Sequence, residues 1–514
     1  MTWKPSNQLE AERLQKLDQL RAAGVNPFPN RVRRTHANAQ AAEVFARAEA
    51  GGGGHPVTVT VCGRIVRRNI KGRASFMHIE DESGRLQLFL KQDVLGETIY
   101  GWVKEKIIEL GDFVQATGTM MRTRTGEISV QVSELVVLSK ALSPLPVIKE
   151  QATDEGVRRY GAFTDPEERY RQRYADLAVN PDVREVFRAR ARTVAAIRRF
   201  LDDEGFLEVE TPILQPLYGG AAARPFVTFH NQLRQNLFLR ISFELYLKRL
   251  LVGMYDAVYE IGRDFRNEGV SRKHNPEFTQ VEFYKAYIDY EGVMVLTERL
   301  VSSVAEAVTG STSVTFQGHQ IDFAPPWRRV TLRDAILEHT GVDYTAYPDA
   351  DALRAAMRAA GLHPREDSTW GRLVDDMLGD FVEPHLIQPT FVIDYPRDIS
   401  PLAKAKPGEP DLVERFEFFI GGLEMGNAFT EINDPLDQEQ RFVEMGRLYR
   451  AEDEEAHPVD EDYLRAMRYG MPPSGGFGMG VDRLVMLLTD RANIREVILF
   501  PHLREPDGEG DTDE

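Results

Sequence analysis

The segment FRNEGVSRKHNPEFTQVEFYKAY, residues 265–287, decides the fold prediction. We interpret it as a strand, a charged loop and a second strand. This arrangement would bring Arg266 and Phe278 to one cavity, where a guanidinium can pair with phosphate and a ring can stack on a base. An exposed hairpin with solvated charges explains the same residues equally well.

A glycine-rich segment near the C-terminus, SGGFGMGVDRLVMLLTD (474–490), is predicted to be a strand that turns into a helix. Gly476, Gly478 and Gly480 would let backbone or ligand approach closely, although tight packing accounts for them as easily. Arg483 would lie in the first helical turn, where phosphate is favoured. The chain has neither a dinucleotide fingerprint in a βαβ unit nor a P-loop GxxxxGK[ST], so any ATP would bind by another scheme.

A third segment, FEFFIGGLEMGNAFTEIND (416–434), carries carboxylates in an apolar setting. Glu417 and Glu424 flank a Gly-Gly turn, so a hairpin would bring them together as an anchor for Mg²⁺. Further along, burying Glu431 without a partner would be costly, which favours a cation beside it. A structural salt bridge is the alternative explanation for these acids.

The large domain around these segments begins near Arg171. The pair Asn180-Pro181 predicts a helix start with Asn180 as the capping side chain, and Gly205 predicts the helix end. Between them, one apolar helical face carries Val183, Phe187, Ala191, Val194, Ile197 and Leu201. Strands and helices then alternate without a regular βαβ rhythm, which indicates an α+β domain on a mostly antiparallel sheet.

The stretch from residue 57 to 140 contains five short strands with glycine-containing turns, which is typical of the five-stranded oligonucleotide-binding (OB-fold) β-barrel. Phe76 follows a basic turn, so it would either stack on an unpaired base or lie in the barrel core. Cys62, in an alternating strand, is expected in the core.

We divide the chain into five parts. These are an N-terminal helix and basic linker (1–56), the barrel (57–140), a charged, Pro-containing connector (141–170), the large α+β domain (171–504) and an acidic disordered tail (505–514). The length alone, 514 residues, predicts about three domains.

Composition and charge exclude several classes of protein. The chain is 42% hydrophobic and 28% charged, which is ordinary globular composition. It lacks the ~18–20-residue apolar run of a membrane span and a signal peptide, and its one cysteine excludes a multi-cysteine metal site. A reducing, cytoplasmic location fits. The net charge is −17, but residues 1–140 hold 20 Lys and Arg against 15 Asp and Glu, so a nucleic-acid partner stays possible.

Three blocks, in order EVETPIL (208–214), FRNEG…HNPEFT (265–279) and GMGVDR (478–483), resemble motifs 1, 2 and 3 of the class II aminoacyl-tRNA synthetases. Further segments are similar to bacterial-type lysyl-tRNA synthetases: RYRQRYADL (169–177), GGAAARPF (219–226), ELYLKRL (244–250), YPRDISPLAK (395–404) and RFEFFIGGLEMGNAFTEIND (415–434). The resemblance runs from the N-terminal helix to about Leu503.

This resemblance implies a fold and an activity. An OB-fold barrel would bind the anticodon, and a catalytic domain on an antiparallel sheet flanked by helices would form a homodimer through motif 1. The enzyme would use ATP and Mg²⁺ to activate L-lysine to lysyl-adenylate, and would then transfer lysine to the 3′ end of tRNA(Lys). It would be cytoplasmic, without a membrane partner.

The resemblance also implies a role for each matching residue. Arg266 would hold the α-phosphate and Arg483 the γ-phosphate, both as catalytic residues. The remaining ATP contacts would be Glu268 at the adenine edge, Phe278 by stacking and His274 at the phosphate tail. Glu417 and Glu424 would ligate Mg²⁺, while Phe76, Gln87 and Glu127 would read the anticodon.

The implied lysine site contains Gly219, Gly220, Glu244, Glu282, Tyr284, Asn427, Phe429 and Glu431. Glu244 and Glu431, aided by Tyr284, would grip the ε-ammonium, because a desolvated ammonium must be paired. Glu282 and the Gly219–Gly220 backbone would bind the α-ammonium.

The chain departs from the family pattern at a few positions. Ala-Pro-Glu is usual where it has Ser242-Phe243-Glu244, Arg is usual at Lys273 and Gly at Ala428, and acidic residues are usual near Arg234–Asn236. None of these changes removes a principal ligand.

Two other functions would fit parts of this sequence pattern. An aspartyl- or asparaginyl-tRNA synthetase shares barrel and motifs, but Glu244 and Glu431 stand where an aspartate pocket needs a cation. A non-charging relative, either an RNA-binding regulator or a lysyl-transferring paralogue, would be expected to lose Arg266, Arg483, the Glu417/Glu424 pair or the barrel, and this chain keeps them all.

Overall fold

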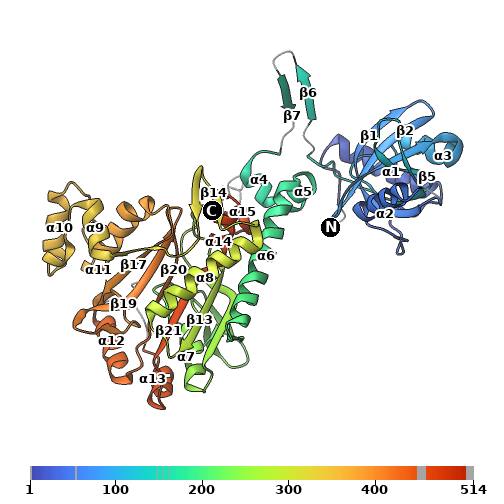
Figure 1. The fold of residues 1–514 in the computed structure, drawn as a ribbon. Helices are drawn as coiled ribbons and strands as arrows, with labels where there is room; N and C mark the ends of the chain where they lie inside the picture. The colour runs from blue at the N-terminus through green and yellow to red at the C-terminus, as the bar shows by residue number, and fades with distance from the viewer. Residues whose placement is uncertain are drawn as a thin grey trace, which may run out of the picture. The chain divides into compact units, whose positions relative to one another are not determined.

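The computed structural model describes residues 3–52, 55–146, 149–153, 156–160, 163–448 and 459–504. The chain divides into two compact units, Met1–Thr164 and Asp165–Glu514, which are described separately (Figure 1). Their boundary falls inside the predicted connector. The predicted acidic tail, 505–514, lies outside the described residues.

The centre of unit 1 is a closed barrel of five strands in the order β1-β2-β3-β5-β4 (Figure 1). These are β1 (Thr58–Lys71), β2 (Ala74–Asp81), β3 (Gly84–Lys91), β4 (Phe113–Arg122) and β5 (Ile128–Ser139). Neighbours pair antiparallel except β3 and β5, which are parallel. A core of aliphatic side chains fills the barrel, so the predicted five-stranded barrel is confirmed.

Three helices and a hairpin complete unit 1: α1 (Gln8–Ala22), α2 (Asn38–Ala50), α3 (Gln92–Lys104), β6 (Lys149–Thr153) and β7 (Gly156–Tyr160). Helix α1 buries Leu17 and Leu20, and the Arg13 guanidinium donates to the carbonyls of Leu110 and Ala141 at 2.9 Å each. These contacts fix α1 on the end of the barrel.

Unit 2 is built on a nine-stranded sheet. Its strand order is β16 (Arg328–Thr331), β17 (Thr390–Pro396), β19 (Glu409–Ile420), β20 (Leu423–Thr430), β21 (Ser474–Gly480), β13 (Glu277–Ala286), β12 (Ala257–Phe265) and β8 (Leu207–Glu208), with β18 (Ala405–Lys406) beside β19. Only the β16–β17 and β8–β12 pairs are parallel. The predicted α+β domain on a mostly antiparallel sheet is therefore confirmed.

Helices cover both faces of this sheet (Figure 1). On one face, α6 (Pro181–Asp203), α8 (Tyr290–Thr309), α14 (Val481–Leu488) and α15 (Ile494–Val497) share a hydrophobic core with the strands. A second core contains α7 (Glu244–Val252), α9 (Leu332–Thr340), α10 (Ala350–Ala359), α11 (Trp370–Met377), α12 (Pro435–Leu448) and α13 (Glu461–Arg468). Two separate cores hold the sheet rigidly between them.

Short elements make up the rest of unit 2. They are α4 (Pro166–Arg171), α5 (Arg173–Val179), β9 (Leu214–Gln215), β10 (Val227–His230), β11 (Gln235–Leu239), β14 (Ser313–Phe316), β15 (His319–Asp322), and helical turns at Tyr344–Ala346, Leu378–Val382, Glu383–His385 and Arg397–Ile399. Among the described residues, no helix combines the length and apolar character needed to cross a bilayer.

Three local predictions are wrong. Cys62 is only partly buried, with its Sγ 3.8 Å from the Arg33 carbonyl, because the β1 pleat turns its neighbour Val61 into the barrel instead. The Asn180 side chain does not cap α6: it donates to Asp176 Oδ1 at 2.7 Å, because α5 ends directly before it. The apolar face of α6 is also rotated, so that Ala191 is exposed.

Close backbone packing at the centre of the sheet gives a stability prediction. A Cβ at Gly426 on β20 would overlap the Gly478 carbonyl oxygen of β21, whereas a Cβ at the exposed Gly446 of α12 would meet nothing within 4 Å. We expect Gly426→Ala to destabilise unit 2 by about 2 kcal/mol or more, and Gly446→Ala to leave it unchanged or slightly more stable. Denaturant unfolding measures both, and equal stability of the two variants would contradict the packing.

Candidate active site

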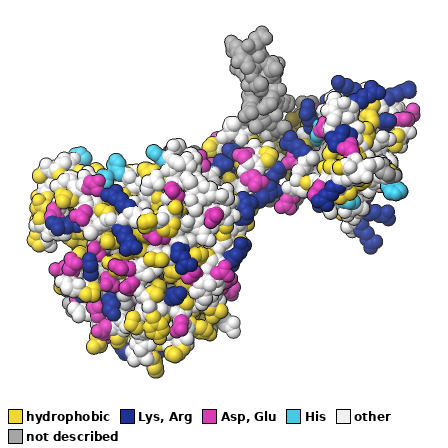
Figure 2. All heavy atoms as spheres, viewed as in Figure 1, with side chains coloured by type: hydrophobic (Ala, Val, Ile, Leu, Met, Phe, Trp, Pro, Cys, Tyr) yellow, Lys and Arg dark blue, Asp and Glu magenta, His cyan; other side chains and the backbone are white. Residues whose placement is uncertain are grey.

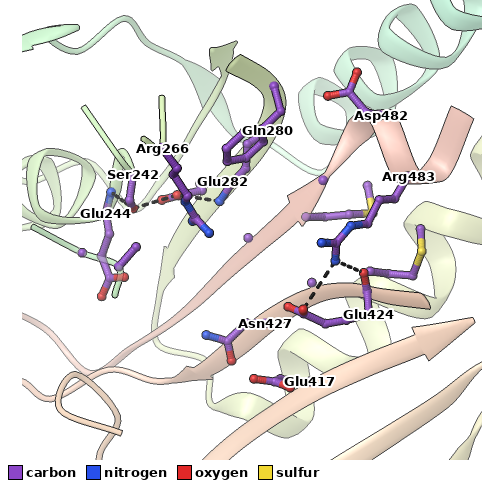
Figure 3. A pocket seen from close by; sticks show the side chains of 18 of the residues that line it. Ser242, Glu244, Arg266, Gln280, Glu282, Glu417, Glu424, Asn427, Asp482 and Arg483 are labelled. Carbon is purple, nitrogen blue, oxygen red and sulfur yellow. Dashed lines mark hydrogen bonds and ion pairs between the residues drawn. The ribbon is translucent and has the colours of Figure 1, made fainter. Parts of the chain in front are cut away.

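A cavity of about 320 Å³ opens beside the central strands of the unit 2 sheet. Strands β13, β20 and β21 line it together with the charged loop 266–276 and the first turn of α7, and Figure 3 shows side chains from these elements around one space. All residues predicted to bind ATP, lysine and Mg²⁺ line this cavity, except Gly219 and Glu431. The structure therefore brings segments far apart in the sequence to a single site.

Strand alternation explains which side chains reach the cavity. Val281 and Phe283 of β13 lie in the core under α6 and α8, so the intervening side chains of Glu282 and Tyr284 point to the opposite face. The register across β13, β21 and β20 then forms two rows, Glu282–Gly478–Asn427 and Tyr284–Gly476–Phe429. In each row a glycine lies between larger residues, and the missing side chains create the hollow.

One end of the cavity is basic. Arg483, on the first turn of α14, donates to the Glu424 carbonyl and lies 3.4 Å from Glu424 Oε2. Its other terminal nitrogen is 3.2 Å from His274 Nε2. Across the cavity, the Arg266 guanidinium lies 5.1 Å from the centre of the Phe278 ring. Two guanidiniums and a ring face thus surround the space where a nucleoside triphosphate would fit.

His274 is neutral at physiological pH in this environment. Burial lowers its pKa to about 4, helped by the positive charge of Arg483. Its Nδ1 is 2.9 Å from the Ser271 hydroxyl, which fixes the ring orientation. The imidazole therefore adds hydrogen bonding, and not a further positive charge, to this end of the cavity.

Glu417 and Glu424 come from the neighbouring strands β19 and β20, as predicted from the hairpin (Figure 3). Glu417 accepts from Arg415 Nη2 at 2.6 Å and from the Tyr395 hydroxyl at 3.0 Å. Burial nevertheless raises the pKa of Glu417 to about 7. Burial also acts to raise the pKa of Glu424, but Arg483 and Arg266 outweigh it and leave that pKa below its usual value.

The other end of the cavity is acidic. Glu282 is buried and accepts from the Ser242 hydroxyl at 2.9 Å, Gln280 Nε2 at 2.8 Å and the Tyr284 hydroxyl at 3.1 Å (Figure 3). Burial raises the pKa of Glu282 to about 8, and the nearby carboxylate of Asp264 acts in the same direction. A cation placed beside Glu282 would reverse this shift.

Glu244 and Glu431 meet at the bottom of the acidic end. Both are buried, and the fully buried ammonium of Lys248 lies between them in ion pairs with each. Burial raises the pKa of Glu431, and Lys248 opposes that shift. Glu431 does not line the cavity directly, but a Cβ at the cavity-lining Gly476 would overlap its Oε1, so only glycine leaves room there.

The remaining predicted residues of the site have more modest contacts. Gly220 has φ +87°, and its Cβ would meet Ser242 Oγ and Glu244 Cβ at 2.9 Å, so a side chain is excluded. Gly219 lies behind it, where a Cβ would meet Leu245. Asn427 accepts from Arg415 Nε at 3.0 Å, and Glu268 is an exposed residue at the cavity wall.

Lys273, which stands where the family pattern usually has arginine, lines the cavity and is paired with Glu383. Its Nζ donates to Glu383 Oε1 at 2.6 Å, and the same oxygen accepts from the Glu424 backbone at 3.3 Å. Glu383 therefore links the charged loop to the β19–β20 hairpin.

In unit 1, the residues predicted to read the anticodon lie on neighbouring strands. Phe76 of β2 is half-buried and stacks on Phe89 of β3, with ring centres 4.9 Å apart. Gln87 donates to Glu127 Oε2 at 2.6 Å, and His78 Nε2 is 2.9 Å from Glu127 Oε1. A ring pair and a polar cluster thus occupy one part of the barrel.

Sequence reasoning missed Lys248, Arg415 and His78. The spacing of Glu244 and Lys248 by four residues in ELYLKRL is the signal for the first, because i and i+4 side chains meet on a helix. Arg415 and Glu417, two apart on one strand, share a face by the same kind of argument. No pattern in the sequence points to His78.

Comparisons with known proteins agree with this geometry. The family model for tRNA synthetases class II (D, K and N) matches residues 165–504, and the model for the OB-fold nucleic acid binding domain matches residues 59–138. The fold and site are thus those of a class II tRNA synthetase with an OB-fold domain.

Full-length relatives indicate which family within this class the chain belongs to. Proteins named lysine--tRNA ligase are 53% identical in Chloroflexus aurantiacus, over 97% of this chain and 99% of the relative, and 54% identical in Roseiflexus castenholzii, over 97% and 99%. The relative in Roseiflexus sp. (strain RS-1) is 53% identical over 98% and 99%. The chain belongs to the lysine--tRNA ligase family.

The environment of His274 gives a pH prediction. Since its pKa is lowered to about 4, His274 should stay neutral from pH 8 down to about pH 5 and titrate near pH 4. As pH falls, the unfolded chain takes up this proton near pH 6.5, but the folded protein does so only near pH 4. The contribution of neutral His274 to the free energy of unfolding is therefore complete above pH 6.5 and is lost as pH falls through about 4.

NMR of protein labelled at its 11 histidines, with the His274 signal assigned through His274→Gln, measures this titration. Arg483→Met removes a repelling charge, so it should move the midpoint upward. A wild-type midpoint near 6.5 would contradict the described environment.

Proposed function

We propose that this enzyme activates L-lysine with ATP to form lysyl-adenylate and pyrophosphate, and then transfers lysine to the 3′ end of tRNA(Lys). The observation that carries the proposal is a single cavity with the guanidiniums of Arg266 and Arg483 at one end and the buried carboxylates of Glu244 and Glu282 at the other, with Glu431 directly behind Gly476. Such a site fits a triphosphate and an amino acid whose side chain ends in an ammonium. The names of the full-length relatives support the same substrate.

The charges at the acidic end distinguish lysine from aspartate and asparagine, the other two amino acids in the description of the matched family model. A buried aspartate carboxylate would require a cation facing it, but Glu244 and Glu431 occupy the bottom of the site. Their one internal cation, Lys248, is already shared between them. An anionic or neutral side chain would therefore be rejected.

The chemistry needs positioning and charge stabilisation more than a strong base. One oxygen of the lysine carboxylate attacks the α-phosphorus of ATP in line with the departing pyrophosphate, so that a P–O bond forms as another breaks. Arg266 stabilises the charge on the α-phosphoryl oxygens, and Arg483 binds the γ-phosphate. A ribose hydroxyl of the terminal tRNA adenosine then attacks the activated carbonyl, and AMP leaves.

The adenosine is proposed to bind between Arg266 and Phe278, whose guanidinium and ring form one wall of the cavity. Glu268 would accept a hydrogen bond from the adenine amino group. His274, neutral and fixed by Ser271, would contact the phosphate tail. These roles agree with the placement of all four side chains along the cavity.

Glu417 and Glu424 are proposed to hold Mg²⁺ together with phosphate oxygens. Mg²⁺ in nucleotide sites takes one or two carboxylates and completes its shell with phosphate and water oxygens, and this donor set fits. The pKa of Glu417, raised to about 7, is consistent with a carboxylate that gains a cation when substrate binds. When bound, Mg²⁺ would neutralise phosphate charge.

The barrel of unit 1 is proposed to bind the anticodon of tRNA(Lys) through Phe76, Gln87 and Glu127. Figure 2 shows Lys and Arg side chains prominent on the visible face of unit 1, in agreement with its excess of basic residues. A positive field attracts the phosphate backbone, and the Phe76–Phe89 pair provides a platform for base stacking.

We also propose that the enzyme is a cytoplasmic homodimer. Large apolar side chains are exposed around the motif 1 segment and the small sheet that follows it, among them Leu207, Ile213, Leu214, Val227 and Phe229. Clustered exposed apolar residues favour burial against a partner, and a second copy of the chain is the partner proposed.

Lysine-dependent ATP–pyrophosphate exchange tests the activity. With Mg²⁺ present, we expect exchange with lysine and only background with each of the other nineteen standard amino acids, because only lysine supplies the ammonium that the buried carboxylates require. Exchange with aspartate or asparagine in place of lysine would contradict the proposal.

Substitution of Phe76 separates the two steps of the reaction. Phe76→Ala should lower kcat/KM for tRNA charging by roughly 10- to 100-fold, since stacking of a base on a ring contributes about 1–3 kcal/mol. It should leave lysine-dependent pyrophosphate exchange unchanged, because Phe76 belongs to unit 1. Phe113→Ala, which removes another exposed ring of the barrel, serves as the control. Equal losses in both variants would exclude a specific role for Phe76.

A further inference from the structure

The buried lysine of the acidic end, Lys248, has no role in the chemistry described so far. It lies on the second turn of α7, is fully buried, and pairs with Glu244 on its own helix and with Glu431 at the end of β20. Its Nζ is also 5.3 Å from the ring centre of Phe429 and 5.9 Å from that of Tyr284. The protein thus places an ammonium of its own in contact with both carboxylates proposed for the substrate ε-ammonium.

Carboxylates outnumber ammonium groups at this end of the site. Glu244, Glu282 and Glu431 are all more than nine-tenths buried, and Lys248 supplies one ammonium for the three. Arg415, whose charge also acts on Glu244, is paired with Glu417. Two carboxylates are left without an ammonium of their own, and lysine brings two ammonium groups, at its α-carbon and at its ε-carbon.

The hydrogen bonding of the Glu431 carboxylate agrees with this count of carboxylates and ammonium groups. Glu431 Oε2 contacts Lys248, while its Oε1 accepts no hydrogen bond from any residue that the structure describes and lies against the cavity-lining Gly476. A fully buried carboxylate oxygen without a donor is costly unless a ligand supplies one. Lys248 therefore occupies one side of the carboxylate and leaves the other available.

We propose that Lys248 is a positioning residue for the amino-acid site: its ammonium favours the ionised forms of Glu244 and Glu431 and keeps them at a fixed spacing, so that both receive the ε-ammonium of bound lysine. This inference rests on the proposed function. Without Lys248, two adjacent buried carboxylates would repel each other, and one would take up a proton and lose its attraction for the substrate. Other titratable groups around the cluster are Glu282, Tyr284, Arg415 and Tyr463.

Kinetics of the full-length enzyme test the inference, with pyrophosphate exchange as the readout. Lys248→Met removes the charge and keeps the length of the side chain. We expect the KM for lysine to rise on the order of 100-fold, while the KM for ATP changes by less than about threefold. Lys285→Met is the matched control, because Lys285 also lies over an aromatic ring, that of Phe206, but not at the cavity, and its KM values should stay at those of the wild type.

The pH profile separates positioning from a merely structural role. In Lys248→Met one of the two carboxylates has to lose a proton before lysine binds, so its KM for lysine should fall as pH rises, more steeply than in the wild type. In Lys248→Ala, added propylamine should restore part of the lysine affinity by returning an ammonium to the vacated space. Both effects require the charge of residue 248.

Three results would overturn the inference. These are a folded Lys248→Met with the wild-type KM for lysine, equal increases of both KM values, and failure of both Lys248→Met and Lys248→Gln to fold, which would make Lys248 a structural ion only. Absence of lysine-dependent exchange in the wild-type enzyme would instead contradict the proposed function itself.

Discussion

The cost of burying an unpaired charge is the constraint on which this structure depends. Glu244, Glu282 and Glu431 are buried in unit 2, and Lys248 is ion-paired with two of them. Placing carboxylates together in a buried site is costly, and under the proposed function a substrate with two ammonium groups would offset that cost on binding. In this account, the same group of buried carboxylates selects the amino acid and lowers the stability of the substrate-free protein.

Rigid scaffolding makes that arrangement possible. The central strands lie between two hydrophobic cores, and their register fixes which residues face each other. Glycines on β21 alternate with Phe477 and Met479, which are buried in the core on the opposite side. One face of β21 is thus packed in the core, and the other face carries no side chains at the glycines. The cavity follows from this asymmetry, and Gly476 in addition leaves space for the Glu431 carboxylate.

Much of the fold and the site could be predicted from the sequence because the relevant signals are local or ordered along the chain. Alternation within strands predicted the barrel, the lack of a regular βαβ rhythm predicted the mostly antiparallel sheet, and the segments that match the family predicted the residues that line the cavity. What could not be predicted depends on contacts across the fold. Cys62 turned away from the core because of the pleat register, and Asn180 bonded to Asp176 because a short helix precedes it. Lys273 pairs with Glu383, and Lys248 pairs with Glu431. In both pairs the two residues are far apart in the sequence.

Equilibrium binding of lysine and of norleucine, compared by calorimetry with ATP absent, tests the central claim most directly. Norleucine has the same carbon skeleton without the ε-amino group, so it leaves Glu244 and Glu431 with Lys248 as their only cation. If paired charge governs recognition, norleucine should bind more weakly than lysine by on the order of 1000-fold. Binding of norleucine within about tenfold of lysine, a difference of about 1.4 kcal/mol, would contradict the account, because shape and apolar contact would then be sufficient.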